Sequence, residues 1–137
     1  MKYVCFGYYD KDKFDGMTES DRNAMFDRCW DYDDHLRANG HWAGGEGLQP
    51  AETALTIYLK NGRVATTDGP FTETKEQLGG LLVLEARDMN HAVQLMGQHP
   101  ALTYGNVFEI RPAADMSELI KASEQRRRKG GSQKQHS

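Results

Sequence analysis

Gly80-Leu81-Leu82-Val83-Leu84-Glu85-Ala86 is the segment of this 137-residue chain that most constrains its fold. A nearly continuous apolar run of this length is typical of a central strand that is covered on both faces. Other segments with strand-like composition lie on both sides of it in the chain, at 2–9, 41–47, 53–59, 63–67 and 106–111. Apolar residues at helical spacing predict two helices, one from Thr18 to Asn39 and one from Asp88 to Pro100.

The predicted order of elements is strand, helix, short strand, hairpin, strand, helix, strand. This is the order of a ferredoxin-like α+β fold, built on the split βαβ plan, with a β-hairpin inserted in the middle. The two helices cover one face of such a four-stranded sheet and leave the other face apolar and bare. Because a water-exposed apolar face of that size is unfavourable, we expect a second copy of the chain to cover it.

The segment 67–80, just before and at the start of the central strand, is rich in charged and turn-forming residues. Compact polar loops on a rigid scaffold often carry function. Asp68 is a candidate general base, the alternative being that its carboxylate caps its own turn. Lys75 is a candidate for holding an anionic or carbonyl oxygen of a ligand, the alternative being a salt bridge to Glu73 or Glu76.

Four separated motifs resemble the DGPF group of the YCII-related proteins. They are Asp68-Gly69-Pro70-Phe71 with Glu73-Thr74-Lys75-Glu76-Gln77-Leu78-Gly79-Gly80, then Gly45-Glu46-Gly47-Leu48-Gln49-Pro50, Tyr104-Gly105 and Glu109-Ile110-Arg111-Pro112, preceded by an opening Met1-Lys2-Tyr3 strand. The resemblance spans residues 1 to about 112 in register. We therefore predict a YCII-related (DGPF) domain over 1–112 and a C-terminal extension over 113–137.

The resemblance implies ferredoxin-like subunits that pair into a dimeric α/β barrel, whereas the activity of the DGPF group is mostly unassigned. Other YCII-related proteins have a proposed catalytic pair: a His near the start of the first helix and an Asp just before the Pro that corresponds to Pro100. This chain has Asn23 near the first place and His99 at the second. The chemistry attributed to that pair therefore does not transfer.

Five further residues complete the candidate site. His99 is a candidate catalytic residue that would stabilise developing charge, the alternative being a plain loop role. Glu46, Glu73, Trp42 and Tyr104 are candidate substrate-binding residues, the two aromatic ones as pocket walls or else as core. Glycines on both sides of Glu46 permit close approach of a ligand, but they serve a bulge equally well.

No metal, cofactor or covalent nucleophile is predicted. The chain has no Cys or His pair at metal-ligand spacing, no nucleotide-binding glycine motif and no Gly-x-Ser-x-Gly turn. Cys5 and Cys29 lie in apolar patterns and predict buried free thiols, which favours a reducing cytoplasm. No apolar run approaches the length of a membrane span.

The formal net charge of −3 is unevenly distributed. Residues 121–137 carry six Lys or Arg and one Glu, so the preceding 120 residues carry a net charge of −8. An acidic body argues against nucleic-acid binding. Met116, Leu119 and Ile120 predict a short helix that packs on the partner subunit, and the basic segment from Arg126 to Ser137 is predicted to be disordered.

Three functions agree with these features. The first is a cofactor-independent enzyme that transfers protons on a small-molecule ligand in a pocket of the homodimer, with Asp68 as base. The alternative is a non-catalytic regulatory or stress-associated binding protein, because DGPF-type proteins are often encoded beside extracytoplasmic-function sigma factors. The third is a purely structural dimer in which the 67–80 segment only maintains the fold.

Overall fold

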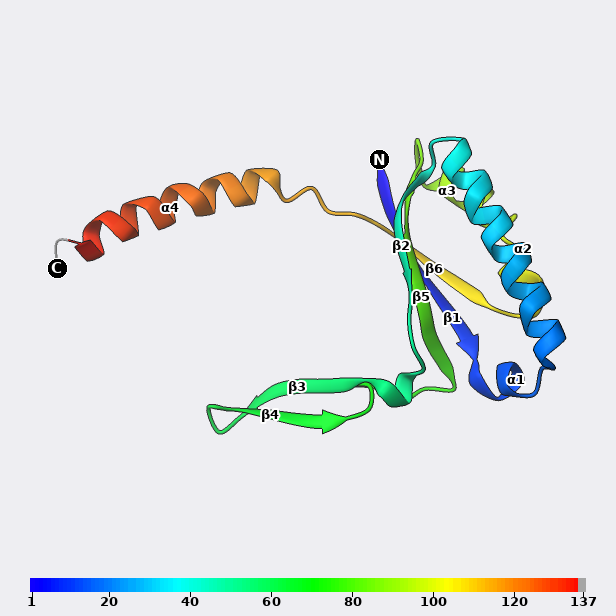
Figure 1. The fold of residues 1–137 in the computed structure, drawn as a ribbon. Coiled ribbons are helices and arrows are strands. Elements are labelled where there is room, and N and C mark those ends of the chain that lie inside the picture. Colours follow the sequence, from blue (N-terminus) through cyan, green and yellow to red (C-terminus); the bar gives the residue numbers. More distant parts are fainter. Residues whose placement is uncertain (136–137) are drawn as a thin grey trace.

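The computed structural model describes residues 1–135 and contains a four-stranded antiparallel sheet (Figure 1). Its strands are β1 (Lys2–Asp10), β2 (Trp42–Gly47), β5 (Glu76–Glu85) and β6 (Val107–Pro112), in the spatial order β2-β5-β1-β6. Helix α2 (Glu19–Ala38) connects β1 to β2, and α3 (Met89–Met96) lies between β5 and β6. This topology is that of the ferredoxin-like fold, so the predicted α+β fold class is confirmed.

Both helices begin where the sequence predicts. The Thr18 hydroxyl accepts a hydrogen bond from the backbone amide of Asp21 at 3.1 Å. In the same way, Asp88 Oδ1 accepts from the amide of His91 at 2.8 Å. These caps satisfy backbone amides that have no partner inside the helix, and each stabilises its helix by about 1 kcal/mol.

The hydrophobic core lies between the sheet and the two helices. Its buried members come from all of these layers: Tyr3, Cys5, Leu36, Leu82, Leu84, Ala86, Ala92 and Met96. Leu36 of α2 and Leu84 of β5 have no exposed surface. Across β1 and β5, Tyr3 pairs with Leu84 and Cys5 with Leu82, so the inward residues of the two strands are in register.

The opposite face of the sheet is apolar and carries no helix (Figure 1). Val4 pairs with Val83 and Phe6 with Leu81 across β1 and β5, which places four apolar side chains side by side. All four are partly exposed. The uncovered apolar face that the sequence predicts is therefore present in the single chain.

The inserted hairpin consists of β3 (Leu55–Lys60) and β4 (Arg63–Asp68) and forms its own two-stranded sheet. Its turn is Asn61-Gly62, with φ angles of 53° and 77°, as the tight two-residue turn predicted from the sequence requires. Figure 1 shows the hairpin projecting from the lower end of the four-stranded sheet, on the side away from α2. We call it the hairpin arm.

Helix α4 (Ser117–Gln135) forms a second arm on the same side of the sheet (Figure 1). The predicted disorder from Arg126 onward was wrong for residues 126–135, which continue the helix. Arg, Lys and Gln, which make up seven of the ten residues 126–135, are good helix formers, and this local preference outweighs Gly130, Gly131 and the polar composition on which the prediction rested. Residues 136 and 137 lie outside the described part, and the division of the chain at residue 112 stays a prediction.

Two connections differ from their predicted form. β5 begins at Glu76, so residues 76–80 of the polar segment belong to the sheet and only 69–75 connect it to the hairpin arm. The charged residues after β1 form a short helix, α1 (Lys11–Asp15), instead of an irregular loop. Asp10 caps this helix by accepting hydrogen bonds from the backbone amides of Asp12 and Lys13.

Candidate functional site

A cavity of about 510 Å³ lies between α2 and the sheet, and we call it the α2 cavity. This volume falls in the range of small-molecule sites, roughly 300–1,000 Å³. Most of its wall is apolar or aromatic. The charged or polar side chains that line it include Asp33, Arg37, His99 and Asn106.

Asp33 and His99 form the central polar pair of the α2 cavity. His99 Nε2 lies 3.2 Å from Asp33 Oδ1. The His99 side chain is 6 % exposed and that of Asp33 is 17 % exposed. Asp33 comes from α2, whereas His99 immediately precedes the 3₁₀ helix Pro100–Tyr104. The fold thus brings together two residues that are far apart in the chain.

The second contact of His99 determines where its proton lies. Nδ1 is 3.1 Å from the backbone nitrogen of Ala101 and accepts its hydrogen bond. A neutral imidazole then carries its proton on Nε2, where it donates to Asp33. The hydrogen bonds of Asp33 within residues 1–135 engage Oδ1 only, so Oδ2 is left for a ligand.

Two aromatic rings fix the plane of His99. Tyr32 and Phe108 meet it edge-on, with ring centroids 5.3 Å and 4.9 Å away. The Tyr32 hydroxyl in turn donates to the backbone carbonyl of Leu95. Because packing and hydrogen bonds both hold the imidazole, His99 presents a fixed donor to Asp33.

A series of neighbouring aromatic rings leads from the α2 cavity to the surface. Phe14 contacts Phe26 at 6.0 Å between ring centroids, and Phe26 stacks on Trp30 at 5.5 Å with an interplanar angle of 14°. Trp30 is 60 % exposed although it lines the cavity. An exposed tryptophan that is already stacked on one side offers its free surface to a flat ligand.

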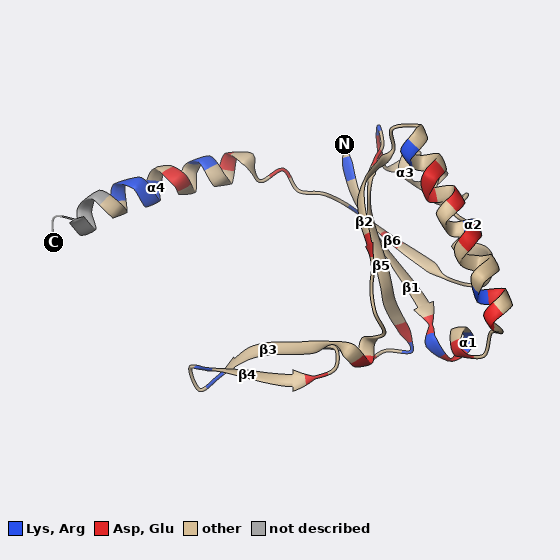
Figure 2. Ribbon diagram, in the orientation of Figure 1, with Lys and Arg blue, Asp and Glu red and all other residues tan. Residues whose placement is uncertain are grey.

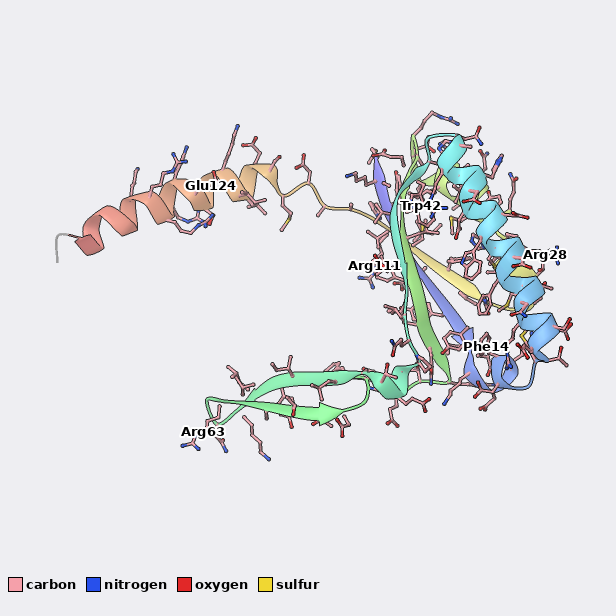
Figure 3. All side chains as sticks on the ribbon, in the orientation of Figure 1. Phe14, Arg28, Trp42, Arg63, Arg111 and Glu124 are labelled. Atoms are coloured by element: carbon pink, nitrogen blue, oxygen red, sulfur yellow. The ribbon has the colours of Figure 1, made fainter. Side chains whose placement is uncertain are left out.

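Trp42 reaches the same cavity from β2. Glu46 also borders the cavity, but it pairs with Leu81, which places its side chain on the uncovered face of the sheet. The Arg37 guanidinium lies 4.2 Å from the centre of the Trp42 ring and 2.8 Å from Asp34 Oδ1. Figure 3 shows Trp42 on the α2 side of the sheet. Of the predicted site residues, the structure therefore brings the side chains of Trp42 and His99 to one cavity, whereas that of Glu46 faces away from it.

Three other predicted residues lie at a different place. Asp68, Glu73 and Lys75 line an open hollow of about 1,080 Å³ at the base of the hairpin arm, which we call the hairpin hollow. All three side chains are exposed. Among the described residues the Asp68 carboxylate accepts no hydrogen bond from its own turn, so the capping role considered from the sequence is not observed.

Lys75 Nζ lies 3.6 Å from Asp10 Oδ2 and forms a salt bridge with it. The alternative predicted from the sequence, a salt bridge to Glu73 or Glu76, is not observed. Asp10 also caps α1. The hydrogen bond from the Lys13 amide, together with the nearby charge of Lys75, holds the pKa of Asp10 below its ordinary value. This contact joins the polar connection before β5 to the end of β1.

Tyr104 lies outside both hollows. Its hydroxyl accepts a hydrogen bond from Arg28 at 3.3 Å.

Asp33 lines the α2 cavity but was not predicted from the sequence. It stands four residues after Cys29 and three before the buried Leu36, so the helical spacing that revealed the core could have placed it on the inner side of α2.

Both cysteines are free thiols. Burial raises the pKa of Cys5 to about 11. Partial burial, and then the negative charge of Asp33, also raise the pKa of Cys29. Since the thiolate is the reactive form, neither side chain suits a nucleophile at neutral pH.

Within residues 1–135, no group of three or more His, Cys, Asp or Glu side chains is arranged to hold a metal ion. Among the described helices, none combines the length and the apolar character needed to cross a membrane.

Comparison with known protein families places the chain. A family model for the YCII-related domain matches residues 1–117. The chain belongs to the YCII-related family. The family predicted from the four sequence motifs is therefore confirmed, and the matched region contains both the α2 cavity and the hairpin hollow.

One relative matches part of the chain. An uncharacterized protein, R00369, of Rhizobium meliloti (strain 1021) is 32 % identical over 71 residues, which cover 49 % of this chain and 55 % of that protein. The chain thus matches about half the length of that relative.

The solved structure of 5-chloro-2-hydroxyhydroquinone dehydrochlorinase (TftG) from Burkholderia phenoliruptrix AC1100, in complex with 2,5-dihydroxybenzoquinone, is also similar. It aligns with a TM-score of 0.49 and 14 % identity over 83 % of this chain and 94 % of that chain. No residue role and no substrate of that enzyme is transferred to this chain.

Proposed function

We propose that this YCII-related protein binds a small, flat, largely apolar molecule in the α2 cavity and transfers a proton on it, with Asp33 as general base and without a cofactor. The single observation that carries the proposal is the Asp33–His99 pair within an aromatic-walled cavity. A carboxylate is the stronger candidate of the two because both ring nitrogens of His99 are already engaged.

The environment of Asp33 supports a role as base. His99 holds Oδ1, which fixes the carboxylate plane and leaves Oδ2 to take a proton from a ligand at hydrogen-bond distance. Only 17 % of the Asp33 side chain is exposed, so few water molecules compete for it. In this proposal His99, which the sequence predicts as a catalytic residue, is a positioning residue for Asp33.

The ligand class follows from the wall of the cavity. Phe26 and Trp30 provide stacked surfaces. Trp42, with the Arg37 guanidinium over its ring, closes the cavity on the β2 side. Such walls favour a planar molecule that stacks on them. Its acidic C–H or O–H group would point toward Asp33.

We also propose that the protein is a homodimer and that it is located in the cytoplasm. The support for a second copy is the uncovered apolar face formed by Val4, Phe6, Leu81 and Val83. Two such faces stacked on each other would form the dimeric α/β barrel that the family resemblance implies. The α2 cavity lies on the other side of the sheet and is complete within one chain.

A ligand screen with two matched variants tests the proposal. Wild type, Asp33→Asn and Asp68→Asn are compared by thermal shift against a panel of hydroxylated aromatic acids, phenols and aromatic ketones. We expect at least one compound to raise the Tm of wild type and of Asp68→Asn while leaving that of Asp33→Asn unchanged. Both substitutions remove one carboxylate charge and keep the side-chain shape, so they differ only in place.

The reverse pattern would contradict the proposal. If a compound stabilises Asp33→Asn but no longer stabilises Asp68→Asn, the site lies at the hairpin hollow, where the sequence places the base. The role of Asp68, with Lys75 and Glu73, therefore stays a prediction that the same screen tests. No second function is proposed, and the regulatory alternative also stays a prediction.

A further inference from the structure

Arg37 is the one Lys or Arg among the described residues that line the α2 cavity. It stands four residues after Asp33 on α2, so the two side chains leave adjacent turns of the helix on the same face. The Cβ atoms of residues at this spacing are about 5–6 Å apart. A ligand that gives its proton to Asp33 therefore lies beside a second, positively charged group.

The position of the Arg37 guanidinium is supported by Trp42 and, through it, by Gly45. The guanidinium lies 4.2 Å from the centre of the Trp42 ring. A Cβ atom at Gly45 would come within 2.8 Å of two carbon atoms of that ring, Cζ2 and Cη2. The missing side chain at Gly45 thus leaves room for the Trp42 ring against the backbone of β2, and the ring supports the guanidinium at the cavity wall.

The other partner of Arg37 leaves most of its N–H donors unused. Nη1 donates to Asp34 Oδ1 at 2.8 Å, and within residues 1–135 the guanidinium makes no other hydrogen bond. The side chains of this pair are 50 % and 73 % exposed, and exposed ion pairs contribute at most about 1 kcal/mol. The remaining donors of Arg37 are available to a ligand.

The charges around Arg37 are mostly negative. Helix α2 contains six Asp or Glu and three Arg residues. Figure 2 shows the helix as mainly red, with blue near the end that leads into β2. A negative group of a ligand is therefore attracted beside Arg37 and repelled beside Asp33, which gives the ligand one favourable orientation in the cavity.

We propose that the ligand of the α2 cavity is an aromatic carboxylate, whose carboxylate group binds Arg37 while its proton-bearing group faces Asp33. This inference rests on the proposed function and names its substrate class. Guanidinium and carboxylate groups fit each other through parallel, charge-assisted hydrogen bonds, and the aromatic wall accommodates the ring between them. Arg37 is a binding residue that determines specificity, and it takes no part in the proton transfer.

Matched pairs of ligands test the preference for a negative charge. Each hydroxylated aromatic acid of the panel, for example salicylic acid, is compared with its primary amide, which has nearly the same shape without the charge. We expect at least one acid to bind wild type at least about tenfold more tightly than its amide, equivalent to roughly 1.4 kcal/mol. Isothermal titration calorimetry near neutral pH measures both Kd values. Amides that bind wild type as tightly as their acids would overturn the inference, and this comparison needs no variant.

Two arginines of the same helix provide the variant and its control. Arg37 and Arg28 each lie over an aromatic ring, that of Trp42 or Tyr104, and each donates one side-chain hydrogen bond. Only Arg37 lines the α2 cavity. Arg37→Met is expected to reduce the preference for acid over amide to less than about threefold, whereas Arg28→Met, which removes the same charge, keeps the preference of wild type.

A preference that survives in Arg37→Met, or that is lost equally in Arg28→Met, would overturn the inference. The second result would mean that the total charge of α2, and not Arg37, attracts the acid. If Arg37→Met does not fold, Arg37→Gln replaces it, with the same expected loss and the same contrary result.

The outcomes also separate this inference from the proposed function. If acid and amide bind wild type equally and neither binds Asp33→Asn, the proposed function stands and only the preference for a carboxylate is wrong. If the acid binds Asp33→Asn and Arg37→Met as tightly as wild type, the α2 cavity is not the site and both proposals are overturned. A wild-type protein that binds no compound of the panel would overturn both as well.

Discussion

The α2 cavity and the hairpin arm place their apolar and charged side chains in opposite ways. In the body that contains the cavity, the core residues Leu36 and Leu84 are fully buried, and the charged Asp33 has a donor, His99, held by packing on both sides. On the hairpin arm, Ile57 and Leu59 are each 70 % exposed and Asp68 lies in the open. The first region is complete within one chain, whereas the second is not.

This difference separates two kinds of candidate residue that sequence motifs alone put together. A carboxylate that is to act as a base needs a fixed orientation and limited access to water, and a single chain already supplies both at Asp33. The charged residues of the segment 69–75 meet neither condition in one chain. Their place beside an unpartnered apolar arm agrees better with an interface between copies.

The largest effect is expected from truncating the core beneath the sheet. Leu84→Ala should lower the free energy of unfolding by about 2–5 kcal/mol, because it leaves a cavity in a fully buried site. Ile57→Ala is the matched control on the hairpin arm and should cost less than about 0.5 kcal/mol at protein concentrations where the chain is monomeric. Urea unfolding of both variants measures the comparison.

Equal losses of unfolding free energy for Leu84→Ala and Ile57→Ala at low protein concentration would contradict this difference between the core and the hairpin arm. They would mean that the hairpin packs on its own chain.

The rates at which thiols react give a kinetic comparison of the same two regions. With the pKa of Cys5 raised to about 11, against 9.0 for an ordinary thiol, the thiolate fraction near neutral pH falls about 100-fold. A reference thiol introduced on the hairpin arm by Leu59→Cys should react with a thiol-specific reagent at least that much faster than Cys5. Cys29, which is only partly buried, should react at an intermediate rate.

Rapid labelling of Cys5 in the folded chain would show that the body opens readily. In that case the interior of the body would be no better protected from the reagent than the hairpin arm.

Replacing His99 removes both of its hydrogen bonds and tests the orientation of Asp33. His99→Phe keeps an aromatic ring between Tyr32 and Phe108 but leaves Asp33 without its donor, and should cost about 1–3 kcal/mol. Lys75→Met breaks the exposed pair with Asp10 and should cost at most about 1 kcal/mol. A larger loss of unfolding free energy for Lys75→Met than for His99→Phe would contradict the prediction that the contacts around the α2 cavity contribute more to stability than those near the hairpin arm.

Much of the fold could be predicted because local chemistry determines it. Thr18 and Asp88 stand directly before apolar helical patterns, Asn61-Gly62 requires a tight turn, and the run from Leu81 to Leu84 suits only a central strand. The site could be predicted only in part. Whether His99 meets Asp33 or Asp68 depends on how α2 and the 3₁₀ helix pack, and no local pattern records that distance.

Two predictions, the functional role of the 67–80 segment, which stays open, and the disorder from Arg126 onward, rested on composition. The 67–80 segment resembles a functional loop because it is polar, yet its polarity also suits a strand start and an interface. The C-terminal basic run resembles a disordered tail by composition, while its individual residues favour a helix. In both cases, a composition was interpreted where the spatial neighbours decide the outcome.

The smallest predicted effect concerns Asp10, which joins the two regions through Lys75. Its pKa is lowered in the folded protein, so the stabilisation is present above the ordinary value of about 3.8 and is lost as the pH falls through the folded value. Asp10→Asn should abolish this contribution to acid stability. Carbon-detected NMR titration should find the Asp10 pKa below that of an ordinary aspartate, and Lys75→Met should raise it part of the way.

A pKa of Asp10 at or above the ordinary value would contradict the capping geometry. A value unchanged by Lys75→Met would assign the whole effect to the α1 cap.

Amide hydrogen exchange measured at two protein concentrations, one below and one above the dimer Kd, tests most directly whether the two regions differ in what completes them. The account predicts that amides of β5 and α2 are equally protected at both concentrations. It also predicts that amides of β3, β4 and α4 exchange rapidly in the dilute sample and become at least about tenfold more protected in the concentrated one. Protection of the arms that does not depend on concentration would contradict it.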